Sequence, residues 1–441
     1  MSFLQSWHAR PGPVLAIVLP IVVAVQLAAQ AVPSAPAPLR LNRRQAIDEA
    51  LAKNPALVAS REQVEQARAQ VVVARAFPDP TFAADVAGQT QALNPTSGNA
   101  SDLGVGVTLP FPGKIRRRGE VATAALQAAE FTLAQLRQQT ASQVAQAYDA
   151  ILVALRHAED LRRAKDLALD FLTKTKARFQ AGTVPKSDVL KAQVDVSQAT
   201  NDAIANERTL ETARASLNRL LGRTGGASVE TTESLEVPGA LAALDRLEAL
   251  ALASRPELQS LAVQRQGAKV ATQLAKQYWL PDVNLTLTRN AMDGAPTTFT
   301  TGIGFSFPLL FGQHEKGEVA TAVHHEAELA ADAADTAAQV SLDVRTAYAT
   351  ASTALRQALF LRDELLPEAR EVYKIASVSY GLGGTSALDL LDAKRTLLDA
   401  ESQYADALGA ANDAQAALEL AVGAPLPPGP PADKTPSGEK P

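Results

Sequence analysis

Apolar and polar residues alternate with a period of two in four short segments of the chain. Val283, Leu285 and Leu287, for example, alternate with asparagine and threonine residues. This period places one class of side chain on each face of a β-strand. Glycine, asparagine and proline are frequent in the connections, notably over 88–101. The pattern predicts two β-hairpins per chain, with strands at 81–86, 103–109, 283–288 and 302–307.

Long stretches rich in alanine, leucine, glutamine, glutamate and arginine fill the rest of the chain and predict helices. They cover 42–76, 115–180, 187–221, 241–278, 313–380 and 387–422. The stretch 115–180 contains no proline, and a helix of that length extends for roughly 100 Å. It is therefore expected to be a rod rather than part of a compact domain. Pro367 interrupts the stretch 313–380 and is expected to bend it locally.

The same pattern occurs twice along the chain, which indicates an internal duplication. Segment 50–57 returns as 251–258, the hexapeptide Gly-Glu-Val-Ala-Thr-Ala occurs at 119–124 and 317–322, and Leu221-Gly222 returns as Val422-Gly423. Several matches in the same order and at a nearly constant offset are not expected by chance between two alanine-rich helices. We predict a first repeat over 42–222, a linker over 223–240 and a second repeat over 241–423.

The N-terminus has the pattern of an export signal. An apolar run over 14–29 follows His8 and Arg10, and the tripeptide Ala-Gln-Ala at 29–31 fits a cleavage site. These features predict a signal peptide over 1–31. A transmembrane anchor is the alternative, but a proline and a glutamine interrupt the run, which is short for the hydrocarbon core of a bilayer.

The segments next to the repeats are rich in proline. Residues 32–41 are expected to form a spacer after the signal peptide, and the polar tail over 424–441 is expected to be disordered. Beyond the N-terminal run, no segment is apolar enough for a transmembrane helix. If the protein spans a membrane, the sequence therefore predicts that it does so with its strands.

Composition excludes several functional classes. The formal net charge of −5 is unlike that of a basic nucleic-acid binder. The chain has no cysteine, which excludes disulfides, thiolate metal sites and a lipoprotein anchor. We find no nucleophile–base pair, phosphate loop or metal-ligand cluster, so neither an enzyme nor a cofactor is expected. His324 and Glu328, with His325 beside them, place a histidine and a glutamate at positions i and i+4, which could ligate a metal, but a solvated helix face is the favoured interpretation.

Four strands raise a problem of closure. They cannot form a closed barrel by themselves, and open sheet edges are not tolerated in lipid. Either the hairpins form a sheet outside the membrane, or several chains close one barrel together. The export signal favours the second alternative, and three chains would supply twelve antiparallel strands, which lies within the size range of membrane barrels.

Two similar turn motifs connect the longest predicted helices. The first contains Arg178-Phe179-Gln180-Ala181-Gly182 and Ser187-Asp188, and the second contains Ser379-Tyr380-Gly381-Leu382-Gly383 and Leu388-Asp389. With these turns and its duplicated strand starts, the chain resembles the TolC-type outer-membrane efflux proteins from about residue 39 to residue 423. The run Phe-Pro-Gly-Lys at 111–114 is similar to that of the subgroup that serves heavy-metal resistance pumps.

The resemblance implies a mainly α fold with membrane β structure. It implies a homotrimer in the outer membrane, in contact with lipid, with a twelve-stranded barrel on a periplasmic helical tunnel. It also implies two partners, namely a periplasmic adaptor (membrane fusion) protein and an inner-membrane pump of the resistance-nodulation-division type. Such a duct is a passive, gated conduit, and no nucleic acid takes part.

Asp389 and Asp392 are the sharpest candidate site. They are three residues apart and share one face of a helix. The resemblance implies that they line the closed entrance, where three copies would place six carboxylates that favour cations. The alternative is a solvated first turn of a helix, in which aspartate is favoured by capping and by the helix dipole.

The resemblance also implies a gate and an adaptor-docking site at the turns. Tyr380 and Asp188 match positions that bond between neighbouring helices and hold the tip closed. The family archetype has an arginine where this chain has Thr385, so we expect weaker closure or closure by a different contact. The residues assigned to the gate and to docking are Arg178, Phe179, Gly182, Ser187, Asp188, Tyr380, Gly383 and Thr385.

The leading functional hypothesis is an outer-membrane exit duct for metal cations or small toxic solutes, as part of a tripartite efflux pump. The sequence leaves the cargo open between metals, drugs and proteins. An exit duct for type I protein secretion is the second hypothesis. The third is a structural envelope protein that joins layers without conducting anything.

Overall fold

The computed structural model describes residues 39–86, 101–223, 229–291, 295–306 and 312–428. The signal peptide expected over 1–31, residues 32–38 of the expected spacer, most of the connection over 88–101 and the tail from residue 429 lie outside these ranges. Within them, no helix is both long enough and apolar enough to cross a membrane.

Each repeat begins with two short helices rather than one. In the first repeat α1 (Arg43–Lys53) and α2 (Pro55–Arg75) are separated at Asn54, and in the second α5 (Leu244–Ser254) and α6 (Pro256–Ala275) are separated at Arg255. The prediction of continuous helices over 42–76 and 241–278 was therefore wrong. The physical reason is that a residue before proline is pushed to extended backbone, while proline suits the first position of a new helix.

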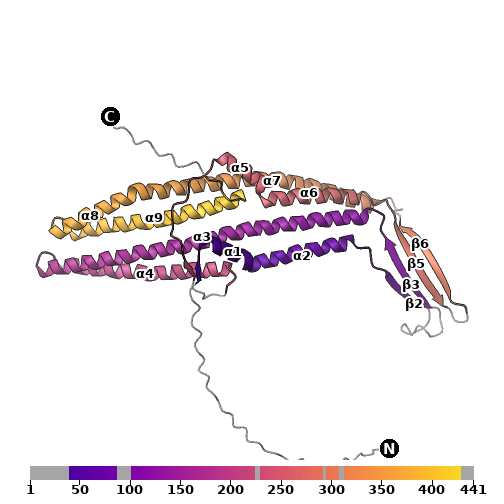
Figure 1. The fold of residues 1–441 in the computed structure, drawn as a ribbon, viewed down its shortest axis with the longest axis horizontal. Helices are drawn as coiled ribbons and strands as arrows, with labels where there is room; N and C mark the ends of the chain where they lie inside the picture. The colour runs from indigo at the N-terminus through magenta and orange to yellow at the C-terminus, as the bar shows by residue number, and fades with distance from the viewer. Residues whose placement is uncertain (1–38, 87–100, 224–228, 292–294, 307–311, 429–441) are drawn as a thin grey trace, which may run out of the picture. The chain divides into compact units, whose positions relative to one another are not determined.

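Long helical hairpins follow, as predicted (Figure 1). In the first repeat α3 (Lys114–Gln180) is one continuous helix of 67 residues, and α4 (Lys186–Leu220) returns along it. In the second repeat α7 (Gln313–Phe360) leads through a short π-helix (Leu361–Leu365) into α8 (Leu366–Leu382), and α9 (Ala387–Val422) returns. The interruption expected near Pro367 is thus a π-helix, in a rod whose counterpart in the first repeat has no break.

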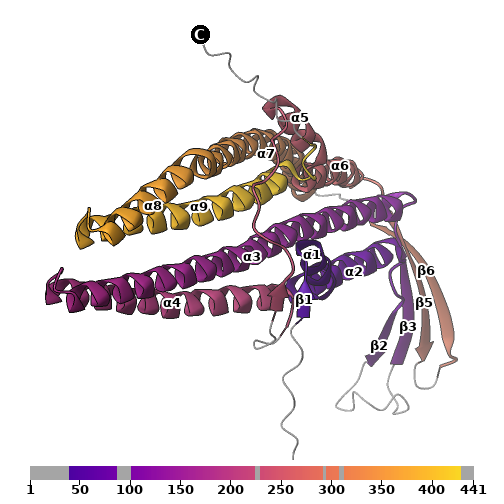
Figure 2. The ribbon, with the colours of Figure 1, turned by 60° about the vertical axis from the view of Figure 1, so that its left-hand side comes forward.

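The strands form one four-stranded sheet (Figure 2). It contains β2 (Thr81–Val86), β3 (Ser101–Leu109), β5 (Asp282–Ala291) and β6 (Thr298–Ser306), in the order β2-β3-β5-β6. Every neighbouring pair is antiparallel. Both predicted hairpins are confirmed. The sheet also joins the two repeats, because β3 pairs with β5 along its whole length.

A second, two-stranded sheet was not predicted. Strand β1 (Leu39–Leu41) pairs in parallel with β4 (Val229–Thr231), so the expected spacer and the expected linker each contribute a strand. Leu41 and Val229 are buried beside α3. The hydroxyl of the fully buried Tyr148 donates a hydrogen bond to the carbonyl of Leu41, 3.0 Å away. This contact holds strand β1 against helix α3.

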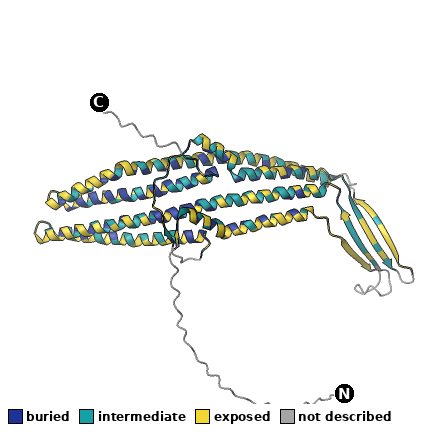
Figure 3. Ribbon diagram, in the orientation of Figure 1, coloured by how far each residue is buried: buried dark blue, intermediate teal, exposed yellow. Residues whose placement is uncertain are grey.

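The buried residues lie along the helices, where these pack on one another (Figure 3). Alanine is the most frequent buried residue of α3 and makes up half of the buried residues of α9. A side chain at Gly409 of α9 would lie only 2.5 Å from Val153 of α3, so glycine is required for this close approach. Small residues therefore allow the rods of the two repeats to pack with their backbones close together.

Lys114 joins the first rod to the strands of the second repeat. Its ammonium group donates to a carboxylate oxygen of Asp282 and to the carbonyl of Leu280, both at 2.8 Å. The same carboxylate accepts the backbone N–H of Phe111 at 2.9 Å. The lysine of the Phe-Pro-Gly-Lys run thus has a structural role at the junction of helix and sheet.

A cluster of acidic side chains lies near the middle of the rods. Asp149 of α3 is 2% exposed and accepts a hydrogen bond from Arg43, 2.8 Å away. Burial raises the pKa of Asp149 from 3.8 to about 7; Arg43 opposes the shift, and Asp413 and Glu233 add to it. Burial likewise raises the pKa values of Asp413 and Glu419 on α9, again against Arg43.

Candidate gate at the helical turns

The two turns that connect the rods share one backbone geometry. Gly182 and Gly383 adopt φ angles of 74° and 82°, a region that disfavours any residue with a Cβ atom. The N–H of Gly182 bonds to the carbonyl of Phe179, and the N–H of Gly383 bonds to that of Tyr380. Both glycines therefore end their helices in Schellman-type caps, which explains why the two turn motifs match.

Tyr380 of α8 connects the two hairpins near the turns. It is 1% exposed, and its hydroxyl shares a hydrogen bond of 3.1 Å with that of Thr175 on α3. The guanidinium carbon of Arg178 lies 4.6 Å from the centre of its ring, within the range of a cation–π interaction. Arg178 also donates to the Tyr380 carbonyl at 2.7 Å. Phe171 packs on the ring, with centroids 5.6 Å apart.

These contacts place an arginine against the turn of the second repeat even though the sequence lacks one at Thr385. Thr385 itself lies 3.5 Å from the carbonyl of Ala376, to which its hydroxyl donates. The contact found for the Tyr380 hydroxyl is Thr175, whereas Asp188 pairs with Lys191 on its own helix at 3.4 Å. Within one chain, Tyr380 thus bonds to a neighbouring helix, whereas the ion pair of Asp188 stays within α4.

Asp389 and Asp392 lie on the exposed face of the first turns of α9. The carboxylate of Asp389 accepts hydrogen bonds from the backbone N–H and the hydroxyl of Ser386, at 3.1 and 2.8 Å. The Ser386 hydroxyl accepts the N–H of Asp389 in return, which completes a capping box. Asp389 thus caps its helix, while Asp392 forms no ion pair with any described residue. In a single chain, the carboxylates of both Asp389 and Asp392 are therefore exposed to solvent.

The remaining candidates lie on the outside of the turns. Ser187 is exposed, and Phe179 exposes much of its ring. No atom lies within 4 Å of a Cβ placed on Gly182. This side of the first turn is therefore accessible to a partner.

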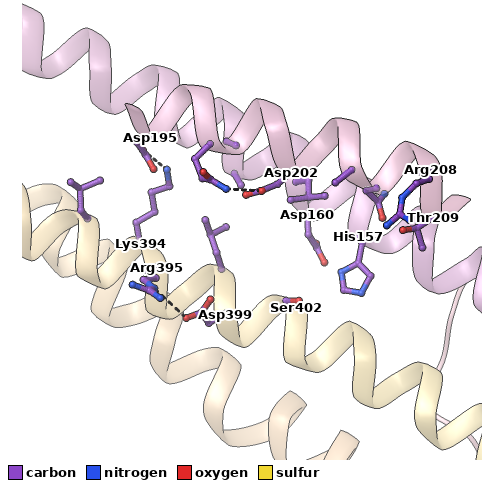
Figure 4. A pocket seen from close by; sticks show the side chains of 18 residues that line it. His157, Asp160, Asp195, Asp202, Arg208, Thr209, Lys394, Arg395, Asp399 and Ser402 are labelled. Atoms are coloured by element: carbon purple, nitrogen blue, oxygen red, sulfur yellow. Dashed lines mark hydrogen bonds and ion pairs between the residues drawn. The ribbon is translucent and has the colours of Figure 1, made fainter. Parts of the chain in front are cut away.

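A cleft of about 800 Å³ opens between the hairpins behind the candidate gate. Helices α3 and α4 form one wall and α9 the other (Figure 4). Lys394 of α9 reaches across to Asp195 of α4, with 2.6 Å between the ammonium nitrogen and a carboxylate oxygen. Sequence reasoning missed this pair, although a lysine between Ala393 and Leu397 on the buried face of α9 was a signal.

The described residues contain no group of three or more side chains that could hold a metal ion. His325 and Glu328 form an exposed pair at 3.1 Å, and His314 and Glu318 form another at 3.2 Å. A histidine and a carboxylate at such a spacing are normal on a solvated helix.

Two repeats of a β-hairpin and long antiparallel helices, joined by one four-stranded sheet and ending in matching glycine turns, define a duplicated helical-hairpin protein. A family model described as outer membrane efflux protein matches residues 46–223 and 247–424, and the chain belongs to this family. It is an outer-membrane efflux channel protein, as the resemblance of its turns predicted.

Known relatives support the same fold. The cobalt-zinc-cadmium resistance protein CzcC of Cupriavidus metallidurans is 24% identical over 387 residues, which is 86% of this chain and 89% of that protein. The structure of CusC matches with a TM-score of 0.73 at 18% identity, over 87% of this chain and 92% of that one. The outer membrane protein VceC of Vibrio cholerae matches with a TM-score of 0.71 at 20% identity, over 87% and 96%.

Proposed function

We propose that three copies of the chain assemble into a passive, gated exit duct, the outer component of a tripartite efflux pump. The strands of the three copies form one closed sheet in contact with outer-membrane lipid, and the rods extend into the periplasm as a tunnel. The observation that carries this proposal is the set of unpartnered surfaces on the flanks of a single chain.

The first of these surfaces are the two sheet edges. Strands β2 and β6 each have one neighbour among the described strands. Because every pairing in the sheet is antiparallel, β6 of one copy runs antiparallel to β2 of the next. Phe82 on β2 and Phe299 and Ile303 on β6 are exposed, as expected of strands that meet lipid. A ring of copies satisfies both edges at once.

The second surfaces are apolar stripes on the outermost helices. Val372, Ile375, Val378 and Leu382 recur at helical spacing along α8, and all four are exposed. Helix α4 exposes Leu190 and Val194 in the same way. Such stripes favour burial against another copy of the chain, and the ring that closes the sheet brings neighbouring rods together.

The turns support the assignment of a gate and of a docking site. Three copies of Asp389 and Asp392 around one axis give a ring of six carboxylates, which favours cations and resists anions. The exposed Phe179 and Leu382 at the turns offer apolar anchors for a periplasmic adaptor. The duct catalyses nothing, and an inner-membrane pump of the resistance-nodulation-division type supplies the energy.

Metal cations are the cargo that the observations favour, with small toxic solutes as the wider class. The relative CzcC is named for resistance to cobalt, zinc and cadmium, and a carboxylate constriction suits divalent cations. Growth of a deletion strain on zinc, cobalt and cadmium salts, compared with growth on antibiotics, tests the cargo. Metal export would be refuted if the deletion strain were sensitive to antibiotics but not to the metal salts, and if the wild-type gene restored its resistance to antibiotics.

Planar-bilayer conductance of the purified protein tests the duct. We expect cation-selective single-channel currents from the wild type and a loss of cation preference in the variant Asp389→Ala/Asp392→Ala. Asp399→Ala removes an exposed carboxylate from the same helix, beside Arg395, and should leave selectivity unchanged. The absence of any current from the wild type and from both variants would rule out a conducting duct.

A further inference from the structure

The ion pair between Asp195 and Lys394 differs from the other charged pairs of the helical tip in its burial. Lys394 is 4% exposed, and the side chain of Asp195 is three-quarters covered. The pairs Lys191–Asp188 and Arg395–Asp399 nearby lie within single helices and keep exposed basic partners. A buried ammonium group that loses its carboxylate partner is strongly destabilised until it becomes hydrated.

The pair also bridges the two repeats. Asp195 belongs to the hairpin of α3 and α4, and Lys394 to the hairpin of α8 and α9. Figure 4 shows the lysine spanning the cleft between the two walls. Further from the turns, Arg163 lies 4.0 Å from Glu401 and His157 lies 2.9 Å from Asp406 across the same seam. Asp195–Lys394 is the member of this series nearest to the turns.

The position of Lys394 links it to the candidate constriction. It lies two residues after Asp392 on α9, but on the buried face, whereas Asp392 is exposed. Any separation of the hairpins that moves α9 away from α4 must break this ion pair. The second hairpin also contains the π-helix over 361–365, an element that breaks the regular ladder of hydrogen bonds.

We propose that the Asp195–Lys394 ion pair is an intrachain latch, which holds the two helical hairpins of one protomer together behind the constriction and keeps the duct closed. This inference rests on the proposed gated duct. It assigns the closing contact to two residues outside the turn motifs, in a chain that has threonine at position 385. Opening requires that the carboxylate and the ammonium separate and that both become hydrated.

Conductance of the full-length protein in planar bilayers tests the latch. The variant Asp195→Asn keeps the shape of the side chain and removes its charge. It should raise the open probability about tenfold or more, because a two-state equilibrium responds strongly to the loss of one partner of a buried pair. Lys394→Met should do the same. The reversed pair Asp195→Lys/Lys394→Asp should return the open probability towards that of the wild type.

Asp399→Asn is the matched control. Like Asp195→Asn, it removes one negative charge, but from an exposed carboxylate on α9 that does not bridge the two hairpins. Circular dichroism and the amount of assembled oligomer show whether each variant is folded. Folded Asp195→Asn and Lys394→Met proteins with wild-type open probability would overturn the latch, as would a reversed pair that stays open. In both cases the wild type still conducts, so the proposed duct itself would stand. A wild type without current would instead refute the duct.

Discussion

Replacement of Asp149 by asparagine should remove much of the pH dependence of stability. Asp149 is buried beside Arg43, and its pKa is raised from 3.8 to about 7. Between these values the folded protein binds a proton that the unfolded chain does not bind, so the free energy of unfolding falls as the pH rises. A shift of this size corresponds to about 4 kcal/mol once the pH is well above 7.

The acidic neighbours of Asp149 should preserve part of the pH dependence of stability in the Asp149→Asn variant. Asp413 and Glu419 also have raised pKa values, so some dependence on pH should persist after Asp149→Asn. From about pH 5 to about pH 8 the contribution of Asp149 alone changes by about 3 kcal/mol. For a chain of 441 residues this corresponds to a fall of about 3 °C in Tm.

Thermal unfolding followed by circular dichroism at fixed protein and detergent concentrations measures the effect. The wild type should lose stability over this range, whereas Asp149→Asn should be more stable than the wild type at the upper end and nearly equal at the lower end. Asp166→Asn removes an exposed carboxylate from the same helix and serves as the control. A wild-type Tm that rises with pH, or an Asp149→Asn curve parallel to that of the wild type, would refute the reasoning.

Three further substitutions test individual contacts by the same thermal assay. Tyr148→Phe removes the hydrogen bond to Leu41 and should cost about 1 kcal/mol; an unchanged Tm would contradict it. Gly383→Ala should cost about 1–2 kcal/mol because of its positive φ angle, whereas Gly381→Ala within α8 should be neutral or stabilising. Lys114→Met should cost about 2 kcal/mol, since two acceptors at the start of β5 lose a charged donor.

The elements that local pattern determines were predicted well from the sequence. The strands at 283–288 and 302–307 follow from strict alternation. The 67-residue helix α3 follows from a long stretch without proline. Asn54-Pro55 and Arg255-Pro256 are repeated motifs within stretches whose composition predicts continuous helices. Their meaning depends on the conformation before proline, which separates each stretch into two helices.

Contacts between segments that lie far apart in the chain were not predicted, because local sequence pattern does not determine them. The pairing of β3 with β5 and that of β1 with β4 join segments that lie far apart in the chain, and nothing in either segment specifies the partner. The same holds for the candidate site. The turn glycines were recognised because their geometry is local, whereas Asp195 and Lys394 meet only through the packing of two repeats.

The parallel pairing of β1 with β4 also constrains the order in which the protein can form. Arg40 and Glu230, which face each other in this pairing, are 190 residues apart in the chain. Closure of so long a loop has an entropic cost that only the completed first repeat can offset. A chain that emerges N-terminus first therefore carries an unsatisfied strand until its first repeat and the following connection have been delivered. The first residues of the folded body therefore find their partner only after the first repeat has been delivered, so a product truncated before β4 would keep an open end that proteases can recognise.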